Sequence, residues 1–425
     1  MTGSARVTVD TREELAGGAW STDVASAPDA WPYLSAPWLR ATTTALAGTA
    51  SPLHAVAHRA RGEEAWLPGY LFKQPPAVDW DPRTYLGWER PDGMQVCCGV
   101  ESSGDATAEV ARWGEDTLFP ALVVGSPLGY RSEAAYSFWA PGLLGRLTTT
   151  LLEAARASGA RSVVAPWVPQ RSGNEEVLEA FRAAGGSDAY WGLDDYLPLE
   201  AASYAEHVAQ QPRKRRQRLV GDQAALARAG LEIRRVAGAD LEPYADRVAE
   251  LVCMNREKNG AGEEPHHIST VLRALLAAGA ELWGYLGLRD GEVVAACVAI
   301  RRGRRLFVKW AGFDYGVLGT RSGLYFPFCF DMPLRDAYGA GLRWMELGSG
   351  AHEAKTLRGC HSRTVSTALW LADEALRPRA AELLRDFGQR RRRAFDTDPA
   401  PAPAPVPLVL TPASSSSSSC CGGPS

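Results

Sequence analysis

The sequence has no apolar run that approaches the roughly 18 residues a membrane-spanning helix needs. Its first twenty residues mix Arg, Asp and Glu and contain no apolar stretch of the kind that forms the centre of a secretory signal. We therefore expect a cytoplasmic protein that makes no membrane contact.

An excess of charge of either sign is also missing. The 425 residues carry 46 Lys and Arg against 49 Asp and Glu, for a formal net charge of -3. This balance excludes a protein that is basic over its whole surface, so any contact with nucleic acid has to be a local patch. The hydrophobic share of 46% is typical of globular proteins, and the length allows about two to three domains.

Cysteine spacings that bind zinc are absent. The eight cysteines form no C-x-x-C pair, so we expect no structural metal. Four of them stand singly in apolar segments, where a buried free thiol is expected: Cys253, Cys297, Cys329 and Cys360. The G-x-S-x-G, G-x-x-x-x-G-K-[ST] and strand-linked G-x-G-x-x-G motifs are also missing, which disfavours hydrolases of that type, P-loop enzymes and Rossmann enzymes.

Two parts of the chain show the same order of predicted elements: a hairpin, a strand, a glycine-containing loop, a helix, a strand, a helix and a strand. In the first part we predict strands at 52–60, 65–72, 122–125, 161–166 and 189–199, and helices at 143–157 and 175–184. In the second part we predict strands at 281–289, 292–301, 306–314, 342–347 and 365–371, and a helix that ends at Tyr338. A helix at 373–393 closes the ordered part. The repeated order predicts an internal duplication.

These elements divide the chain into four parts. Residues 1–200 form a first domain, 201–235 a basic linking helix with the entry to a strand, and 236–395 a second domain. Residues 396–425 form a tail rich in Pro, Ser and Cys that we expect to be disordered, because it has too little apolar surface to bury. An alternative for this tail is a peptide segment that is carried for chemical modification.

A basic cluster lies between the two domains, in a predicted helix at 204–229. Its sequence is PRKRRQR, with five basic residues, of which Arg213, Lys214, Arg215 and Arg216 are consecutive and Arg218 follows. At about 100° per residue these side chains spread around the helix and form no single stripe. The cluster belongs either to a solvated linker helix or to a contact with the phosphates of a nucleotide, a cofactor or tRNA.

Two blocks of sequence resemble the FemAB-like branch of the GNAT acyltransferases. Residues 196–236 contain an aromatic strand, a helix that opens onto the basic cluster, and a Gly-Leu-Glu step into the next strand. Residues 282–371 contain a hairpin, a strand end AGFDY, a helix and a glycine-rich turn, GSGAHEAK, which ends in Lys355. The predicted helix departs from the family pattern because it contains Pro327 and Pro333, and Pro333 requires a bend.

The resemblance implies an α/β fold of two tandem GNAT-like domains, each with a mixed, mostly antiparallel central sheet flanked by helices. The implied activity is N-acyltransfer to an amine of a small molecule or peptide. We expect acyl-CoA, the ordinary GNAT donor, because the chain as a whole is mildly acidic. The FemAB side of the resemblance implies aminoacyl-tRNA as the alternative donor, with tRNA as a partner. A third alternative is a non-catalytic protein that keeps the double fold to recognise a ligand.

Amide formation needs a base for the amine and a stabilised oxyanion. Glu346, at a predicted strand end, and His352, after the glycine turn, are candidate bases. Lys355 matches the lysine of the family's turn and is the candidate that stabilises the oxyanion or a donor phosphate. Asp314, at the end of AGFDY, is a further candidate carboxylate, although aspartate in this position commonly caps a turn.

Two segments are candidates for binding the donor. A glycine-containing loop follows the AGFDY strand, and glycines before a helix can expose backbone N–H groups to a pyrophosphate. For acyl-CoA the candidate residues are those of this loop: Gly316, Gly319, Arg321, Ser322 and Gly323. For aminoacyl-tRNA they are those of the basic cluster.

Overall fold

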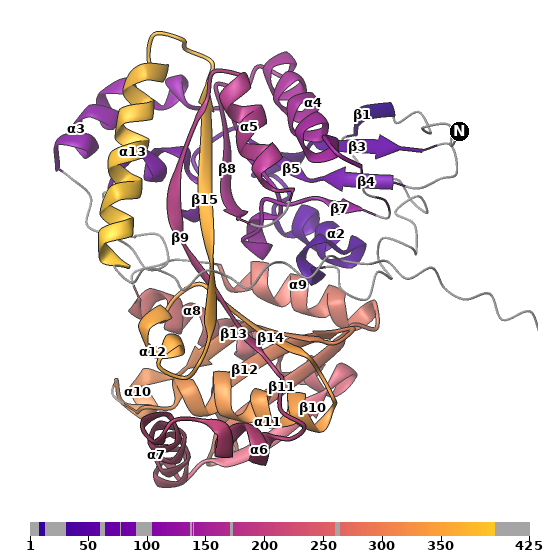
Figure 1. Cartoon of the computed structure of the whole chain (residues 1–425), viewed down its shortest axis with the longest axis vertical. Helices are drawn as coiled ribbons and strands as arrows, with labels where there is room; N and C mark the ends of the chain where they lie inside the picture. Colours follow the sequence, from indigo (N-terminus) through magenta and orange to yellow (C-terminus); the bar gives the residue numbers. More distant parts are fainter. Residues whose placement is uncertain are drawn as a thin grey trace, which may run out of the picture.

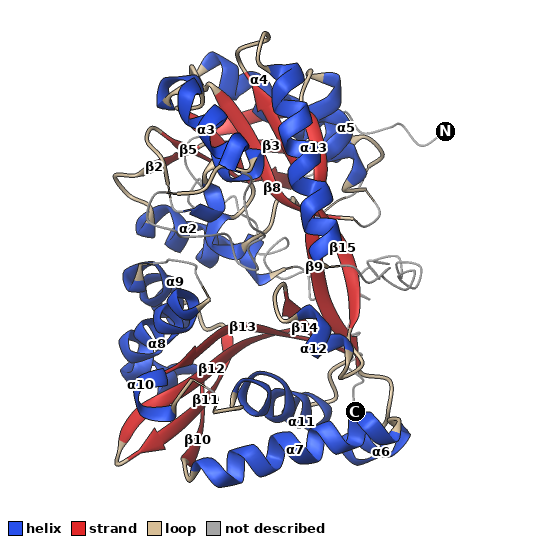
Figure 2. Ribbon diagram, turned by 90° about the vertical axis from the view of Figure 1, so that its left-hand side faces the viewer, coloured by secondary structure: helices blue, strands red, loops and turns tan. Residues whose placement is uncertain are grey.

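The structure is a computed structural model that describes residues 8–12, 31–59, 64–76, 78–90, 104–136, 138, 140–170, 173–259, 264–320 and 322–395. An eleven-stranded sheet forms its long axis, and helices cover both faces of this sheet (Figures 1 and 2). All but two of the strand pairs in the large sheet are antiparallel, so the predicted mixed, mostly antiparallel α/β class is confirmed. The predicted tail at 396–425 and Arg321 lie outside the described residues.

The strands of the large sheet lie in this order: β10 (Glu232–Ala237), β11 (Glu281–Arg289), β12 (Glu292–Arg302), β13 (Arg305–Phe313), β14 (Trp344–Gly348), β9 (Ser187–Pro198), β15 (His361–Leu371), β8 (Ser162–Pro169), β6 (Ala121–Val124), β5 (Gly69–Phe72) and β2 (Ala50–Pro52). A second, four-stranded sheet contains β1 (Thr8–Arg12), β3 (His54–His58), β4 (Glu64–Leu67) and β7 (Ala135–Tyr136).

The helices are α2 (Ala36–Ala45), α3 (Gly104–Trp113), α4 (Leu143–Ala157), α5 (Glu175–Ala183), α6 (Tyr204–Gln210), α7 (Arg213–Ala229), α8 (Ala245–Lys258), α9 (Pro265–Ala277), α10 (Tyr315–Leu318), α11 (Met332–Gly339), α12 (His352–Thr356) and α13 (Arg377–Ala394). No helix in these described ranges is long and apolar enough to cross a membrane.

The sheet contains two series of elements that have the same topology. The first series is β2, β5, β6, α4, β8, α5 and β9, and the second is β11, β12, β13, α11, β14, α12 and β15. Each series has one parallel strand pair, β6 with β8 and β13 with β14, and each parallel pair spans three residue partners. The order predicted from the sequence is therefore present twice in the sheet.

The last strands of the two series are exchanged. β9 ends the first series but pairs with β14 of the second, and β15 ends the second series but pairs with β8 of the first. β9 and β15 have 12 and 11 residues, which is about twice the common length of a strand, and this length lets each of them serve both halves. The two halves consequently share one continuous sheet (Figure 1).

Prolines account for three differences from the predicted elements. The predicted strand 65–72 is wrong as a single strand: it is divided at Pro68, so that β4 joins the small sheet and β5 the large one. The predicted helix 204–229 is likewise divided before Pro212 into α6 and α7. Pro333 follows a π-helical turn (Pro327–Asp331) within helical residues that continue from Tyr325 to Gly339, so the regular hydrogen bonding is interrupted next to the residue that has no N–H.

The core contains the four cysteines expected there. Cys253, Cys297, Cys329 and Cys360 are buried and free, which confirms the prediction from their apolar surroundings. Burial also raises the pKa of the thiols of Cys329 and Cys360.

His54 makes the fold sensitive to acid. It is completely buried in β3, its Nδ1 accepts a hydrogen bond from the Gly69 N–H at 3.2 Å, and burial lowers its pKa from 6.5 to about 4. Below pH 6.5 the unfolded chain gains a proton that folded His54 does not bind, so stability present above pH 6.5 is lost as the pH falls toward 4. We expect this residue to account for a loss of about 3 kcal/mol in the free energy of unfolding.

Urea unfolding at pH 7.5, 6 and 5 checks this expectation. His54→Asn keeps an acceptor oxygen near the position of Nδ1 but cannot be protonated, so its unfolding free energy should fall less than that of the unsubstituted chain. Parallel losses in the two proteins would show that His54 does not carry the pH dependence.

Candidate functional site

The exchanged strands carry adjacent polar residues on opposite faces of the sheet. Asp194 and Asp195 are consecutive on β9, and they lie opposite Arg363 and Ser362 of β15. Because successive side chains of a strand point to opposite faces, Asp194 and Arg363 share one face, and Asp195 and Ser362 share the other. Each face carries a polar cluster.

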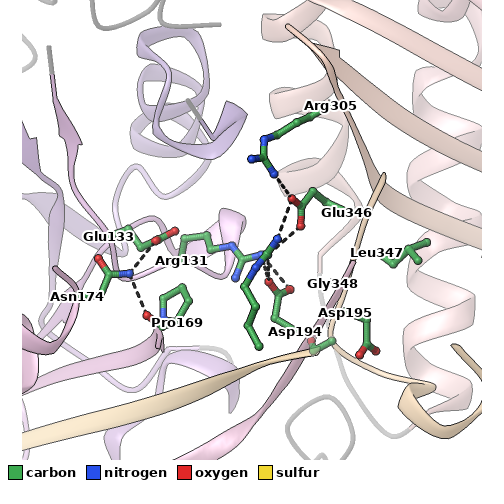
Figure 3. A network of polar contacts seen from close by, with 12 residues as sticks. Arg131, Glu133, Pro169, Asn174, Asp194, Asp195, Arg305, Glu346, Leu347 and Gly348 are labelled. Carbon is green, nitrogen blue, oxygen red and sulfur yellow. Dashed lines mark hydrogen bonds and ion pairs between the residues drawn. The ribbon is translucent and has the colours of Figure 1, made fainter. Parts of the chain in front are cut away.

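The first cluster, which we call the junction network, connects both halves of the chain. It consists of Arg131, Asp194, Arg305, Glu346 and Arg363, of which Figure 3 labels the first four. Asp194 accepts hydrogen bonds from Arg131 at 2.9 Å and from Arg363 at 3.1 Å. Glu346 accepts two from Arg363, at 2.9 and 3.0 Å, and one from Arg305 at 2.5 Å. Arg131 follows β6, whereas Arg305 and Glu346 belong to the second half.

A glycine brings Arg131 into this network. Gly125 has a φ of +102°, and a Cβ atom there would lie 2.0 Å from the carbonyl oxygen of Arg131. Only glycine permits the backbone at position 125 to lie this close to Arg131. The Ser126 N–H donates a hydrogen bond to the same carbonyl at 2.7 Å and closes the loop. The Arg131 guanidinium then lies 4.1 Å from the ring centre of Trp31.

Burial and pairing oppose each other in the junction network, and pairing dominates. Burial alone raises the pKa of the Asp194 carboxyl, but the charges of Arg131 and Arg363 lower it below its ordinary value. Burial disfavours the charged form of Arg363, yet Glu346 and Asp194 raise its pKa. Both oxygens of Glu346 are held by guanidinium groups, so the geometry favours a structural role for Glu346 over the candidate role of base.

The second cluster, which we call the Asp195 cluster, lies on the opposite face and contains Asp195, His352, Lys355 and Ser362. Asp195 Oδ1 is 2.8 Å from His352 Nδ1 and accepts a hydrogen bond from Ser362 Oγ at 2.7 Å. Asp195 Oδ2 lies 3.6 Å from Lys355 Nζ. The structure therefore brings the candidates His352 and Lys355 together through Asp195. The candidate Glu346 lies with Asp194 on the other face, apart from Asp195 (Figure 3).

Lys355 holds the glycine turn from inside. Its buried Nζ donates hydrogen bonds to three successive carbonyl oxygens, those of Leu347, Gly348 and Ser349, at 3.0, 2.9 and 3.3 Å. An ammonium group has three donors, so these bonds use all of them. Lys355 therefore stabilises the turn in this conformation, and contact with a ligand would require it to release a carbonyl.

The turn itself presents backbone donors. Gly348 and Gly350 have φ values of +68° and +88°, which glycine adopts readily. Because the C=O and N–H of one trans peptide unit point in opposite directions, the N–H groups of Ser349 and Gly350 point away from Lys355. Within the described part of the chain, these two N–H groups have no hydrogen-bond partner. Such successive N–H groups can bind an anion or an oxyanion.

Asp314 is distant from both clusters. It lies seven residues beyond Phe307, the partner of Glu346, which corresponds to about 23 Å along a strand. Its carboxylate caps α10 by accepting hydrogen bonds from the N–H groups of Gly316 and Val317, and it pairs with Arg247 at 2.9 Å. Among the residues predicted to hold acyl-CoA, Gly316 thus has its N–H occupied, while Gly319 and Gly323 adopt positive φ. Ser322 adjoins this loop, and Arg321 lies outside the described residues.

The basic cluster occupies the first turn of α7. Arg213, Lys214 and Arg216 are exposed, and Arg215 is partly buried. Arg215 extends toward the segment after α12: a Cβ atom on Gly359 would lie 3.1 Å from its Nη1. The basic cluster therefore lies beside the segment between α12 and β15, at the lower end of the molecule in Figure 2.

The residues that organise both clusters were not among those predicted from the sequence. Asp194 and Asp195 carried a usable signal, because two consecutive carboxylates in a predicted strand must place one on each face. Arg131, Ser362 and Arg363 carried none, since their partners are distant in the sequence. Within the described ranges, no group of three or more His, Cys, Asp and Glu side chains is arranged to hold a metal ion.

The model of the FemAB-like family, described as peptidoglycan biosynthesis/recognition, matches residues 112–404. The chain belongs to the FemAB-like family. The matched range of this FemAB-like chain contains every residue of the junction network and of the Asp195 cluster. No curated protein matches the sequence.

Several solved structures are similar to the FemAB-like chain at low sequence identity. FemX is 11% identical, with 86% of this chain and 98% of FemX covered at a TM-score of 0.46. A tandem GNAT protein from the clavulanic acid biosynthesis pathway is 13% identical, with coverages of 85% and 98% and a TM-score of 0.44. The C-terminal domain of a putative lysylphosphatidylglycerol synthetase from Agrobacterium fabrum is 16% identical, with coverages of 63% and 84% and a TM-score of 0.42.

Proposed function

We propose that this FemAB-like chain is an N-acyltransferase that transfers an acyl or aminoacyl group to an amine of a small molecule or peptide. The observation that carries the proposal is the pairing of His352 with Asp195 beside a turn with two available backbone donors. Family membership supports the same class of reaction.

In the proposed reaction, His352 Nε2 accepts a proton from the attacking amine. The N–H groups of Ser349 and Gly350 stabilise the oxyanion. Lys355 does not take this role, because its three donors are bound to carbonyl oxygens of the turn. The new N–C bond forms as the bond from the acyl carbon to the donor's leaving oxygen or sulfur breaks. Protonated His352 then returns the proton to that leaving group, so the base is regenerated.

Two observations favour aminoacyl-tRNA over acyl-CoA as the donor. Asp314 occupies two N–H groups of the glycine loop and places a carboxylate where a pyrophosphate would have to bind. The three exposed charges of α7, by contrast, are available to phosphates and lie beside the segment that follows α12.

The test incubates the purified chain with labelled aminoacyl-tRNA or acyl-CoA and a panel of amines, and detects the amide product by mass spectrometry. Product from aminoacyl-tRNA alone supports the proposal as stated, and product from acyl-CoA alone supports transfer with the other donor. No product from either donor, with a folded protein and a broad acceptor panel, would instead favour a non-catalytic recognition protein.

Binding of tRNA should depend steeply on salt. Replacing Arg213, Lys214 and Arg216 together by Gln should flatten the log–log slope of affinity against salt by about two to three, since each phosphate contact contributes about 0.7–0.9. The matched control replaces three exposed arginines of the first half by Gln: Arg40, Arg112 and Arg146. Filter binding between 50 and 300 mM salt measures both slopes, and equal slopes would remove α7 from the tRNA contact.

A further inference from the structure

Because of the strand exchange, a residue of the first half contacts a candidate catalytic residue of the second half. Asp195 belongs to β9, the last strand of the first series, while His352 begins α12 of the second. β9 reaches this position because it pairs with β14, where Asp195 is the partner of Gly348 at the start of the glycine turn. Among the described residues, Asp195 of β9 supplies the one carboxylate that contacts His352 Nδ1.

The chemistry of the contact fixes the protonation of the imidazole ring. An ionised carboxylate only accepts hydrogen bonds, so the 2.8 Å contact from Asp195 Oδ1 requires a proton on His352 Nδ1. In the neutral ring the lone pair is then on Nε2. Ser362 donates to the same carboxylate oxygen at 2.7 Å and limits its movement.

We propose that Asp195 is a positioning residue of the transfer reaction, which holds His352 in the tautomer whose Nε2 accepts the proton and stabilises the imidazolium that results. This role rests on the proposed function. It also makes the catalytic site a composite of both halves, so the second half is incomplete without β9.

The described groups beside the pair belong to α12 and to the segment that follows it, where Arg358 and Arg215 also lie near Cys360. On α12, Lys355 lies 3.6 Å from the second oxygen of Asp195, and Thr356 Oγ1 lies 3.5 Å from His352 Nε2. The thiol of Cys360 adjoins the cluster, and burial, assisted by the charge of Asp195, raises its pKa, so it stays neutral. Asp195 is consequently the one anion among the described residues that contacts the imidazole ring.

The test compares Asp195→Asn with two matched variants. Asp188→Asn removes a carboxylate from the same strand, where it pairs with Arg182 away from the cluster. Ser362→Ala removes the other hydrogen bond to Asp195 without changing charge. We expect Asp195→Asn to lower kcat by about 100-fold or more, within the range that a positioned base supplies, with KM within a few-fold of the unsubstituted value.

The split between kcat and KM separates this role from a structural one. Loss of the carboxylate should lower kcat and leave KM nearly unchanged, whereas a general distortion of the turn should change both. Ser362→Ala should lower kcat by less than 10-fold, and Asp188→Asn should leave kcat and KM unchanged. A normal kcat in Asp195→Asn would overturn the inference.

An NMR measurement keeps the inference testable without activity. In the ¹⁵N-labelled full chain, the His352 ring should carry its proton on Nδ1, and Asp195→Asn should mix the two tautomers. A proton on Nε2 in the unsubstituted chain would overturn the positioning role even if transfer is observed. The expected tautomer without transfer from either donor would instead overturn the proposed function, and the role of Asp195 with it.

Discussion

Arg363→Met is expected to lower the free energy of unfolding by about 3–5 kcal/mol, the range for breaking a buried ion pair by removing one partner. Arg363 donates to both Asp194 and Glu346, and it is the only described residue that contacts both carboxylates. Its removal leaves Glu346 with Arg305 alone and Asp194 with Arg131 alone, and it takes the hydrogen-bond donor from the buried Oε2 of Glu346. Urea unfolding of the full chain measures the effect.

Two companion variants separate this cause from a general packing defect. Arg305→Met removes the most exposed guanidinium of the junction network, at 21% side-chain exposure, and should cost clearly less. Adding Glu346→Leu to Arg363→Met removes the buried carboxylate that has lost the donor to its Oε2 and should recover part of the loss. A cost below about 1 kcal/mol for Arg363→Met would show that the network does not hold the halves together.

His352→Asn is expected to lower kcat by about 100- to 10,000-fold, the contribution of a correctly placed base. Asparagine can still donate to Asp195 from a position near that of Nδ1, so the turn should keep its conformation, but it has no basic nitrogen. Single-turnover amide formation measures the loss.

The control for this variant is His361→Asn. His361 is exposed on β15 and stacks on Tyr196 away from the Asp195 cluster, so its replacement should leave kcat within a few-fold. A kcat for His352→Asn within about 10-fold of the unsubstituted chain would assign the proton transfer to another group.

Elements with strong local patterns could be predicted from the sequence. Leu143–Ala157 has one apolar face at helical spacing, and Glu281–Arg289 alternates before an Asp-Gly turn, and both have the predicted bounds. The exchange of β9 and β15 could not be predicted, because both strands are apolar along most of their length and nothing local states which neighbour each one pairs with. Pro68 itself indicated a break between two strands, but the alternating pattern on either side of it favoured a single strand.

The candidate site was predictable in part for the same reason. The glycine-rich turn and the residues after it, His352 and Lys355, were identified from the local sequence. The face of the sheet on which Glu346 lies was not, since it depends on pairing with β9 and β15. The bonds of Lys355 to three carbonyls likewise depend on the path of the turn. Three residues with positive φ determine this path, and no sequence periodicity indicates it.

The central claim is that the acyl carbon reacts at the glycine turn, on the face of Asp195. The most direct test is a donor whose aminoacyl group carries a diazirine, bound to the full chain, photolysed and mapped by peptide mass spectrometry. We expect crosslinks within Gly348–Thr356. Crosslinks confined to the loop after Asp314, or to the Glu346 face around Arg305 and Trp31, would contradict it.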